Sequence, residues 1–126
     1  AADALDYCIF AVAPTRILSL PAMAELLHAA TGWESSSYEI MRYGARRIHL
    51  MRLYNLREGL GREQDVLPDR FFETPIAAGP QRGAVLDRAK FEQSVSTFYE
   101  MMGWDEAGVP RTATLYDYGL EWAGTR

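Results

Sequence analysis

The chain has 126 residues, of which 48% are hydrophobic, and its formal net charge at neutral pH is −4, from 13 basic and 17 acidic side chains. This length and hydrophobicity allow one domain with a core and do not argue for disorder. The acidic balance argues against a nucleic-acid-binding surface, which needs clustered basic residues. No apolar run approaches the length of about 18 residues that a transmembrane helix needs, and no basic leader is visible, so we expect a cytoplasmic protein that does not span a membrane.

The first segment, DALDYCIFAVAP, is short and apolar, ends at Pro14 and contains the single cysteine, Cys8. Its periodicity does not distinguish a strand from a buried turn. One cysteine cannot form an internal disulfide or complete a thiolate metal site. Two interpretations of Cys8 stay open: a small buried thiol, or a metal-cluster ligand whose co-ligands lie elsewhere. The flanking Asp3 and Asp6 either bind a donor-rich ring or cap a turn through their own backbone.

The next segment, LSLPAMAELLHAATGW, predicts a helix that begins after Ser19 and ends at Gly32. Ser19 is a typical N-cap, and Pro21 stands in the first turn, where its missing N–H costs nothing. Gly32 predicts a left-handed C-terminal cap, with Trp33 packing back onto the helix.

The strongest predicted helix begins at a capping box, Ser36 and Glu39, and ends before Gly59. One face carries an apolar stripe, Ile40, Met41, Gly44, Ile48 and Met51. Counting at 100° per residue places Arg42, Arg46 and His49 on the opposite side, so we expect His49 to face solvent. Arg47 falls inside the apolar arc and therefore needs a carboxylate partner, for which Glu58 and Asp65 are the nearby candidates, or an anionic ligand.

A long irregular stretch, GREQDVLPDRFFETPIAAGPQRG, follows that helix. It is apolar enough to predict an ordered crossover whose large side chains pack on the helices: Val66, Leu67, Phe71, Phe72 and Ile76. A further helix is predicted after an Asp87 cap, ending at Gly103–Trp104, and a last short helix from Thr112 to about Tyr118. The predicted fold is mainly α: a single irregular multi-helix domain over residues 1–126, with a long ordered crossover loop.

No catalytic motif is present. The two histidines, His28 and His49, lie on different predicted helices and form no metalloprotease pattern, and no phosphate-binding or nucleophile-elbow sequence occurs. The residues alone therefore identify no catalytic side chain.

Four ordered motifs nevertheless resemble the C-terminal domain of the tungsten-dependent aldehyde ferredoxin oxidoreductase family. They are HAATGWE, then NLREGLGREQDVLPDR from Asn55 to Arg70, then the proline-rich ETPIAAGPQRG, and YEMMGWDEAGVP from Tyr99 to Pro110. The resemblance covers nearly the whole chain.

The opening also resembles a D-x-x-G-L-C motif of that family, here Asp3-Ala4-Leu5-Asp6-Tyr7-Cys8. Asp6 stands at the expected glycine and Tyr7 at the expected leucine. The resemblance implies that Cys8 is one of four thiolate ligands of a [4Fe–4S] cluster and that Asp3 and Tyr7 lie at the pterin. The other three cysteines would lie upstream, so the chain is expected to be a C-terminal fragment of a larger oxidoreductase.

The implied activity is oxidation of an aldehyde to a carboxylic acid. Electrons would pass from a tungsten (or molybdenum) bis-pterin through the cluster to ferredoxin. The implied partners are the upstream domains and ferredoxin, with a second copy of the chain left open, and the isolated chain is expected to bind no cofactor and to be inactive. Two alternatives stay open: a non-catalytic helical interaction domain, and the same domain of a related tungsten enzyme acting on another substrate, such as an aromatic acyl thioester.

Overall fold

The computed structural model describes residues 1–12 and 17–124, and these residues are mainly helical, which confirms the predicted fold class. The helices are η1 (Ala2–Leu5), α1 (Ile9–Val12), α2 (Leu20–Thr31), α3 (Ser37–Arg57), η2 (Arg62–Gln64), α4 (Arg70–Glu73), α5 (Arg88–Met101), α6 (Thr112–Asp117) and η3 (Glu121–Ala123). Within the described ranges the single β-type pairing is an antiparallel bridge between Trp104 and Pro110.

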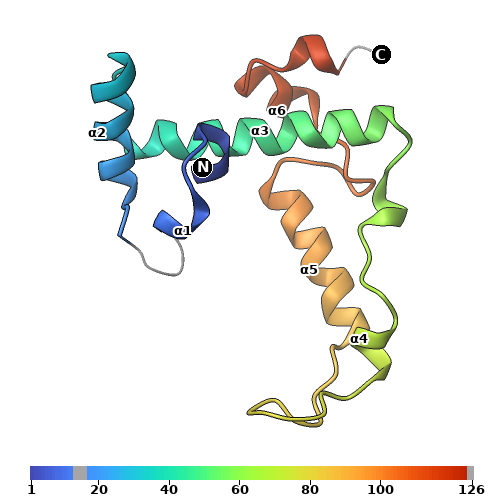
Figure 1. The fold of residues 1–126 in the computed structure, drawn as a ribbon. Coiled ribbons are helices and arrows are strands. Elements are labelled where there is room, and N and C mark those ends of the chain that lie inside the picture. Colours follow the sequence, from blue (N-terminus) through green and yellow to red (C-terminus); the bar gives the residue numbers. More distant parts are fainter. Residues whose placement is uncertain (13–16, 125–126) are drawn as a thin grey trace.

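Helix α3 is the axis on which the other elements lie, with α2 at its N-terminal end, α6 beside its middle and α5 below its second half (Figure 1). The predicted capping box is confirmed: the Ser36 hydroxyl accepts from the Glu39 N–H, and the Glu39 carboxylate accepts from the Ser36 N–H at 2.7 Å. The Ser36 N–H and the Ser36 hydroxyl both donate to this carboxylate and hold the pKa of Glu39 below its ordinary value. The predicted end is confirmed as well, since α3 finishes at Arg57, just before Gly59.

The N-terminal elements η1, α1 and α2 cover only the first half of α3. Their small core consists of Met23, Ala24 and Ile40. Gly44 of α3 permits a close approach here, because a Cβ at Gly44 would stand 2.8 Å from the Cα of Ala1. The opening segment therefore consists of two short helices, η1 and α1, rather than a strand.

The C-terminal elements α6 and η3 lie on the other side of α3. Arg42 and Arg46 point away from the apolar stripe, as predicted, and bind the C-terminal end of α6. Arg42 donates to the Asp117 carboxylate at 3.0 Å, and Arg46 donates to the Tyr118 carbonyl at 2.9 Å. The guanidinium groups thus satisfy carbonyl oxygens that have no partner within α6, and their charge complements the helix dipole.

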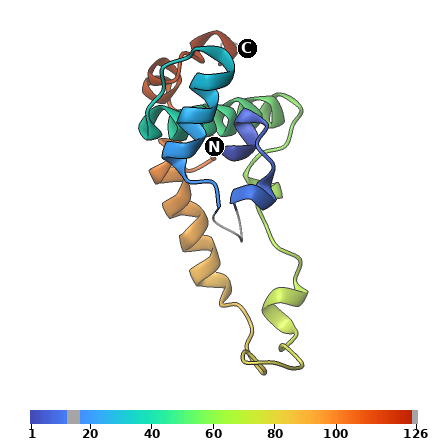
Figure 2. The same cartoon turned by 60° about the vertical axis from the view of Figure 1, so that its left-hand side comes forward.

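The crossover after α3 is ordered, as predicted, but its packing differs from the prediction. It runs through η2 and α4 and forms an arm with α5 that extends away from α3 (Figures 1 and 2). Phe72 packs edge-on against Phe91 of α5, with ring centroids 5.6 Å apart. Val66, Phe71 and Ile76 are exposed. The arm has only two helical layers, so each of its elements has only one neighbour to bury side chains against.

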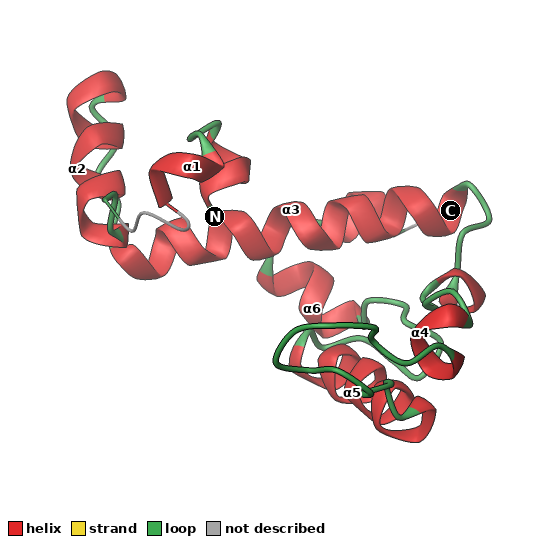
Figure 3. Cartoon of the chain, turned by 60° about the horizontal axis from the view of Figure 1, so that its bottom comes forward, coloured by secondary structure: helices red, strands yellow, loops and turns green. Residues whose placement is uncertain are grey.

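The apolar stripe of α3 is also covered only in part. Ile40 and Gly44 are buried under the N-terminal elements, whereas Met41, Ile48 and Met51 are exposed. The stripe therefore contributes to the core only through Ile40 and Gly44. Figure 3 shows the reason: α1 and η1 lie beside the first half of α3, and α5 lies off its second half.

Candidate functional site

The loop that carries Cys8 is a short turn on the surface. Helix η1 ends at Asp6, which has a left-handed backbone with φ of 57°, and the Tyr7 N–H donates to the Ala2 carbonyl at 3.0 Å. Asp6 is the one non-glycine residue with positive φ in the described ranges. Cys8 follows as an exposed free thiol, which contradicts one of the two interpretations left open, the small buried thiol. An exposed thiol two residues after a left-handed turn is accessible to groups outside the chain.

Two side chains fix this loop to the helices behind it. The Tyr7 hydroxyl donates to the Met23 carbonyl of α2 at 2.9 Å. Asp3 forms an ion pair with Arg47 of α3. The structure thereby corrects the predicted partners of Arg47: Asp65 pairs with Arg52, and Glu58 lies beside Arg57. The reason is geometric, because η1 crosses α3 at Gly44, less than one turn from Arg47.

The residues described here do not build a metal site by themselves. No group of three or more His, Cys, Asp or Glu side chains that could hold a metal ion occurs in residues 1–12 and 17–124. Cys8 fits one position of a thiolate-ligated cluster because its sulfur is exposed and has no disulfide partner. A cluster at this loop would draw its other ligands from other polypeptide.

A second set of functional side chains lies between α3, α5 and the loop after α5. Its centre is Arg52, which is buried and uses all three nitrogens of its guanidinium group. Nε donates to the Gly108 carbonyl at 2.8 Å, Nη1 pairs with Asp65 at 2.8 Å, and Nη2 donates to the Tyr99 hydroxyl at 3.3 Å. The Tyr99 hydroxyl donates in turn to Asp65. Arg52 therefore joins three separate segments of the chain.

The same centre contains His49, with only 1% of its surface exposed. Its Nδ1 accepts a hydrogen bond from the Trp104 indole N–H at 2.9 Å, and its ring lies 4.5 Å from that of Tyr118. The prediction that His49 faces solvent was wrong. His49 lies on the face of α3 opposite the N-terminal elements, and α6 and the Gly103–Trp104 loop cover that face.

Burial sets the direction of two pKa values in this centre. The pKa of His49 is lowered, because burial disfavours the charged imidazolium, although Asp117 opposes the shift. The pKa of Tyr99 is raised, first by burial and then by the hydrogen bond to the Asp65 carboxylate. Both groups are therefore neutral at neutral pH and act as hydrogen-bonding groups.

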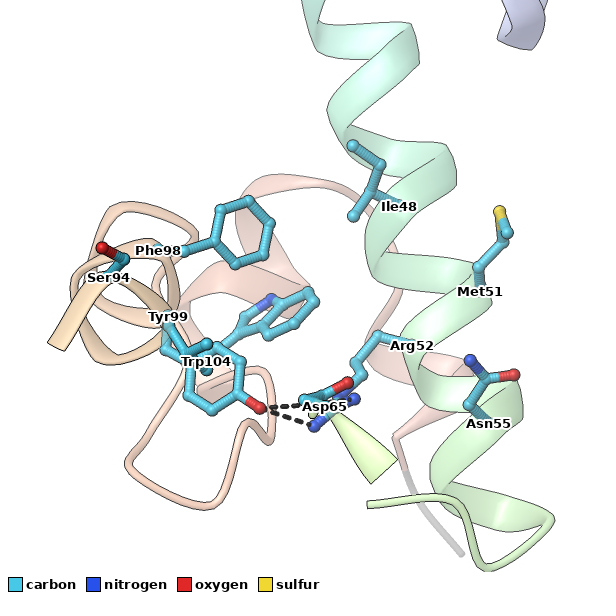
Figure 4. A pocket seen from close by; sticks show the side chains of 10 residues that line it. Ile48, Met51, Arg52, Asn55, Asp65, Ser94, Phe98, Tyr99 and Trp104 are labelled. Carbon is cyan, nitrogen blue, oxygen red and sulfur yellow. Dashed lines mark hydrogen bonds and ion pairs between the residues drawn. The ribbon is translucent and has the colours of Figure 1, made fainter. Parts of the chain in front are cut away.

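A hollow of about 450 Å³ opens beside this centre (Figure 4). Ile48, Met51 and Phe98 form its apolar sides, and Arg52, Asp65 and Tyr99 lie at its floor. Because the three floor groups bond to one another, they offer few free hydrogen bonds to a ligand.

The sequence analysis did not predict this buried centre, although the family-like motifs contain several of its residues. Asp65 belongs to the quoted motif from Asn55 to Arg70, and Tyr99 and Trp104 belong to the motif from Tyr99 to Pro110. The recurrence of the two motifs in one chain was the available signal. The helical periodicity of α3 gave no such signal, because Arg52 lies at the edge of the apolar arc.

Comparison with known proteins places the chain in one family. The family described as "Aldehyde ferredoxin oxidoreductase, domains 2 & 3" matches residues 1–120. The tungsten-containing aldehyde ferredoxin oxidoreductase of Pyrococcus horikoshii is 34% identical over 120 residues, which are 94% of this chain and 19% of that protein. The aliphatic sulfonate oxidoreductase WOR-like subunit of Pyrococcus furiosus is 35% identical over 82 residues, 61% of this chain and 13% of that protein.

A solved structure shares the fold. The active-site complex BamBC of benzoyl coenzyme A reductase, solved with 1,5-dienoyl-CoA, superposes with a TM-score of 0.67 at 21% identity, covering 83% of this chain and 14% of that one. In the described part of the chain, no helix is long and apolar enough to cross a membrane. The chain spans about a fifth of the length of the tungsten-containing relative from Pyrococcus horikoshii, and over residues 1–120 it belongs to the aldehyde ferredoxin oxidoreductase family.

Proposed function

We propose that this chain is the C-terminal domain of a full-length aldehyde:ferredoxin oxidoreductase and that Cys8 supplies one thiolate ligand of its [4Fe–4S] cluster. The observation that carries the proposal is the exposed Cys8 thiol in a loop that turns through a left-handed residue. The family motif has glycine at that position, and glycine is the residue that adopts positive φ without strain. Asp6 keeps the conformation that glycine would provide, which supports aligning this loop with the motif.

Asp3 and Tyr7 are proposed to lie at the pterin. Asp3 is exposed and held by Arg47, so one of its carboxylate oxygens can still accept from a ring N–H. Tyr7 uses its hydroxyl to bind α2 and its backbone N–H to bind the Ala2 carbonyl, so its backbone carbonyl is the group proposed to contact a cofactor. In this proposal the side chain of Tyr7 positions the loop.

The proposed reaction converts an aldehyde and water into a carboxylate, two electrons and three protons, and a bound cluster would carry the electrons toward ferredoxin in the cytoplasm. When bound, the tungsten bis-pterin would supply the redox chemistry. The contribution of this chain is to hold the cluster through Cys8 and to set its surroundings. No residue of this chain is proposed as catalytic, and the isolated chain is proposed to be inactive.

A related tungsten enzyme with another substrate is the second candidate. The 35% identity to the WOR-like subunit of an aliphatic sulfonate oxidoreductase favours keeping it. Turnover of aldehydes, but not of aliphatic sulfonates, by the intact enzyme would support the first assignment. The reverse preference would support the second.

The ligand role of Cys8 is tested in the full-length enzyme, purified without oxygen. Cys8→Ala is preferable to Cys8→Ser because a serine hydroxyl can itself bind iron. We expect the unmodified enzyme to contain about four irons per chain and to show a cluster signal by electron paramagnetic resonance after reduction. Cys8→Ala should lose that signal, whereas the matched variant Asp6→Gly, which restores the family residue, should keep it.

A Cys8→Ala enzyme with unchanged iron content and an unchanged signal would show that Cys8 is not a ligand. If even the unmodified protein contains neither iron nor tungsten, the chain is better explained as a non-catalytic interaction domain. Asp3→Asn separates the two cofactors, since we expect it to lower the tungsten content while the iron content stays the same.

A further inference from the structure

Asp6 holds a backbone conformation that side chains other than glycine rarely adopt. Its φ of 57° is the single positive value at a non-glycine residue in the described ranges, and the family motif has glycine at this position. Aspartate tolerates the left-handed region better than most residues, but glycine adopts it freely. The turn by itself is therefore served by glycine, and the aspartate side chain requires a separate explanation.

The carboxylate of Asp6 has no structural partner among the described residues. Asp6 is exposed, and its carboxylate forms no hydrogen bond or ion pair with another residue that the structure describes. Asp3 and Asp6 are the charged side chains of residues 1–12, and Arg47 of α3 balances the charge of Asp3. Within the described residues, Asp6 thus carries the uncompensated negative charge of the turn that leads to Cys8.

That charge is necessarily close to Cys8. Two residues apart in the chain, the Cα atoms of Asp6 and Cys8 are separated by at most about 7.6 Å. Net charge is one of the factors that set the reduction potential of an iron–sulfur cluster, because negative charge opposes the uptake of an electron. At an effective dielectric constant of about 20, two unit charges about 10 Å apart change an equilibrium constant by at least about tenfold.

We propose that Asp6 lowers the reduction potential of the [4Fe–4S] cluster that Cys8 holds. The inference rests on the proposed function, because it requires the Cys8 thiolate to bind the cluster. The step concerned is the uptake of one electron by the cluster, in which no bond forms or breaks. The Asp6 carboxylate opposes that uptake, so the reduced cluster passes its electron to an acceptor more readily than it would with glycine at this position.

The test is a redox titration of the full-length enzyme, purified without oxygen. Dithionite is added in the presence of mediator dyes, and the electron paramagnetic resonance signal of the reduced cluster is followed. Asp6→Asn removes the charge, keeps the shape and tolerates the left-handed turn. At equal applied potential, we expect its ratio of reduced to oxidised cluster to be at least about tenfold higher than in the unmodified enzyme. For a one-electron couple, a tenfold change corresponds to about 59 mV.

Two further variants separate charge from backbone effects. Asp6→Gly removes the same charge and restores the residue of the family motif, so its ratio should rise in the same direction by a similar factor. Glu73→Gln is the matched control, because it also removes one negative charge. Glu73 is an exposed residue of α4, in the arm that extends away from α3 (Figure 1), so its ratio should stay unchanged.

An unchanged ratio in Asp6→Asn and Asp6→Gly enzymes that keep their iron would overturn the inference and leave the assignment of Cys8 intact. An equal rise in Glu73→Gln would overturn it as well, since the potential would then follow the net charge of the whole enzyme. A Cys8→Ala enzyme that keeps its iron and its signal would remove the ligand role of Cys8, and this inference would be lost with it.

Discussion

Two helices of this chain end in the same dipeptide, and the two tryptophans have opposite environments. Gly32 ends α2 with φ of 75°, and Gly103 follows α5 with φ of 67°. Trp33 has 62% of its surface exposed, whereas Trp104 has 4%. The helix ending is a local property, since both glycines adopt the left-handed conformation that such a cap requires. The burial of the tryptophan that follows is not a local property, since it differs between the two helix ends.

The difference comes from what lies beyond each helix end. After Trp104, the chain turns back through Asp105, whose carboxylate accepts from the Ala107 and Val109 N–H groups, and Trp104 pairs with Pro110. The indole then lies against Phe98 and Tyr99 and donates to His49. After Trp33, the chain leads directly into the cap of α3, and in the described part of the chain no element covers the ring.

The largest expected effect separates the two tryptophans directly. Trp104→Ala removes a buried ring and its hydrogen bond to His49, so we expect it to lower the free energy of unfolding by about 3–5 kcal/mol. Trp33→Ala removes an exposed ring and should change it by less than about 0.5 kcal/mol. Urea unfolding of the chain, followed by far-ultraviolet circular dichroism, measures both. Equal losses would break the comparison.

A smaller contrast is expected between two arginines of α3 that both pair with an aspartate. Arg52→Ala leaves Asp65 without its buried partner and should cost about 3 kcal/mol. Arg47→Ala breaks an exposed pair with Asp3 and should cost at most about 1 kcal/mol. The same unfolding experiment measures both, and added salt should weaken only the Arg47 contribution. A large loss in Arg47→Ala would show that the N-terminal loop is held more firmly than its exposure indicates.

The smallest expected effect is the pH dependence of stability that comes from His49, the hydrogen-bond acceptor of Trp104. Burial lowers its pKa in the folded chain, so the unfolded chain binds more protons as the pH falls below about 6.5. The stability that neutral His49 contributes is therefore complete above about pH 6.5 and is lost as the pH falls toward the folded-state pKa. The stability difference between the unmodified chain and His49→Gln should accordingly shrink with acidification, measured from urea midpoints over that range. A difference that grows on acidification would mean that His49 is charged when buried.

Much of the local structure could be predicted because it depends on residues close in sequence. Ser19, the Ser36–Glu39 capping box and Asp87 each donate or accept within a few residues of their own position, and the structure confirms the helices that they begin. Four motifs and a D-x-x-G-L-C pattern altered at two positions were enough to predict the family. The positive φ of Asp6 agrees with the glycine expected at that position.

The candidate site could be predicted only in part. Helix periodicity gives the direction in which a side chain points and does not say which element lies there. His49 was assigned to solvent because it points away from the apolar stripe, yet α6 and the Trp104 loop cover that side. Arg47 was paired with residues near it in sequence, whereas its partner Asp3 is brought to it by the N-terminal loop crossing at Gly44.

The sequence by itself determined the approximate bounds of α2, α3, α5 and α6, the mainly α class of this protein and the family to which it belongs. The tertiary structure alone decided that Trp104, His49 and Arg52 are buried while Trp33, Ile48 and Met51 are exposed. The physical reason is that capping acts over one turn of backbone. Burial, in contrast, depends on contacts between segments tens of residues apart, such as Arg52 with Gly108 and His49 with Trp104.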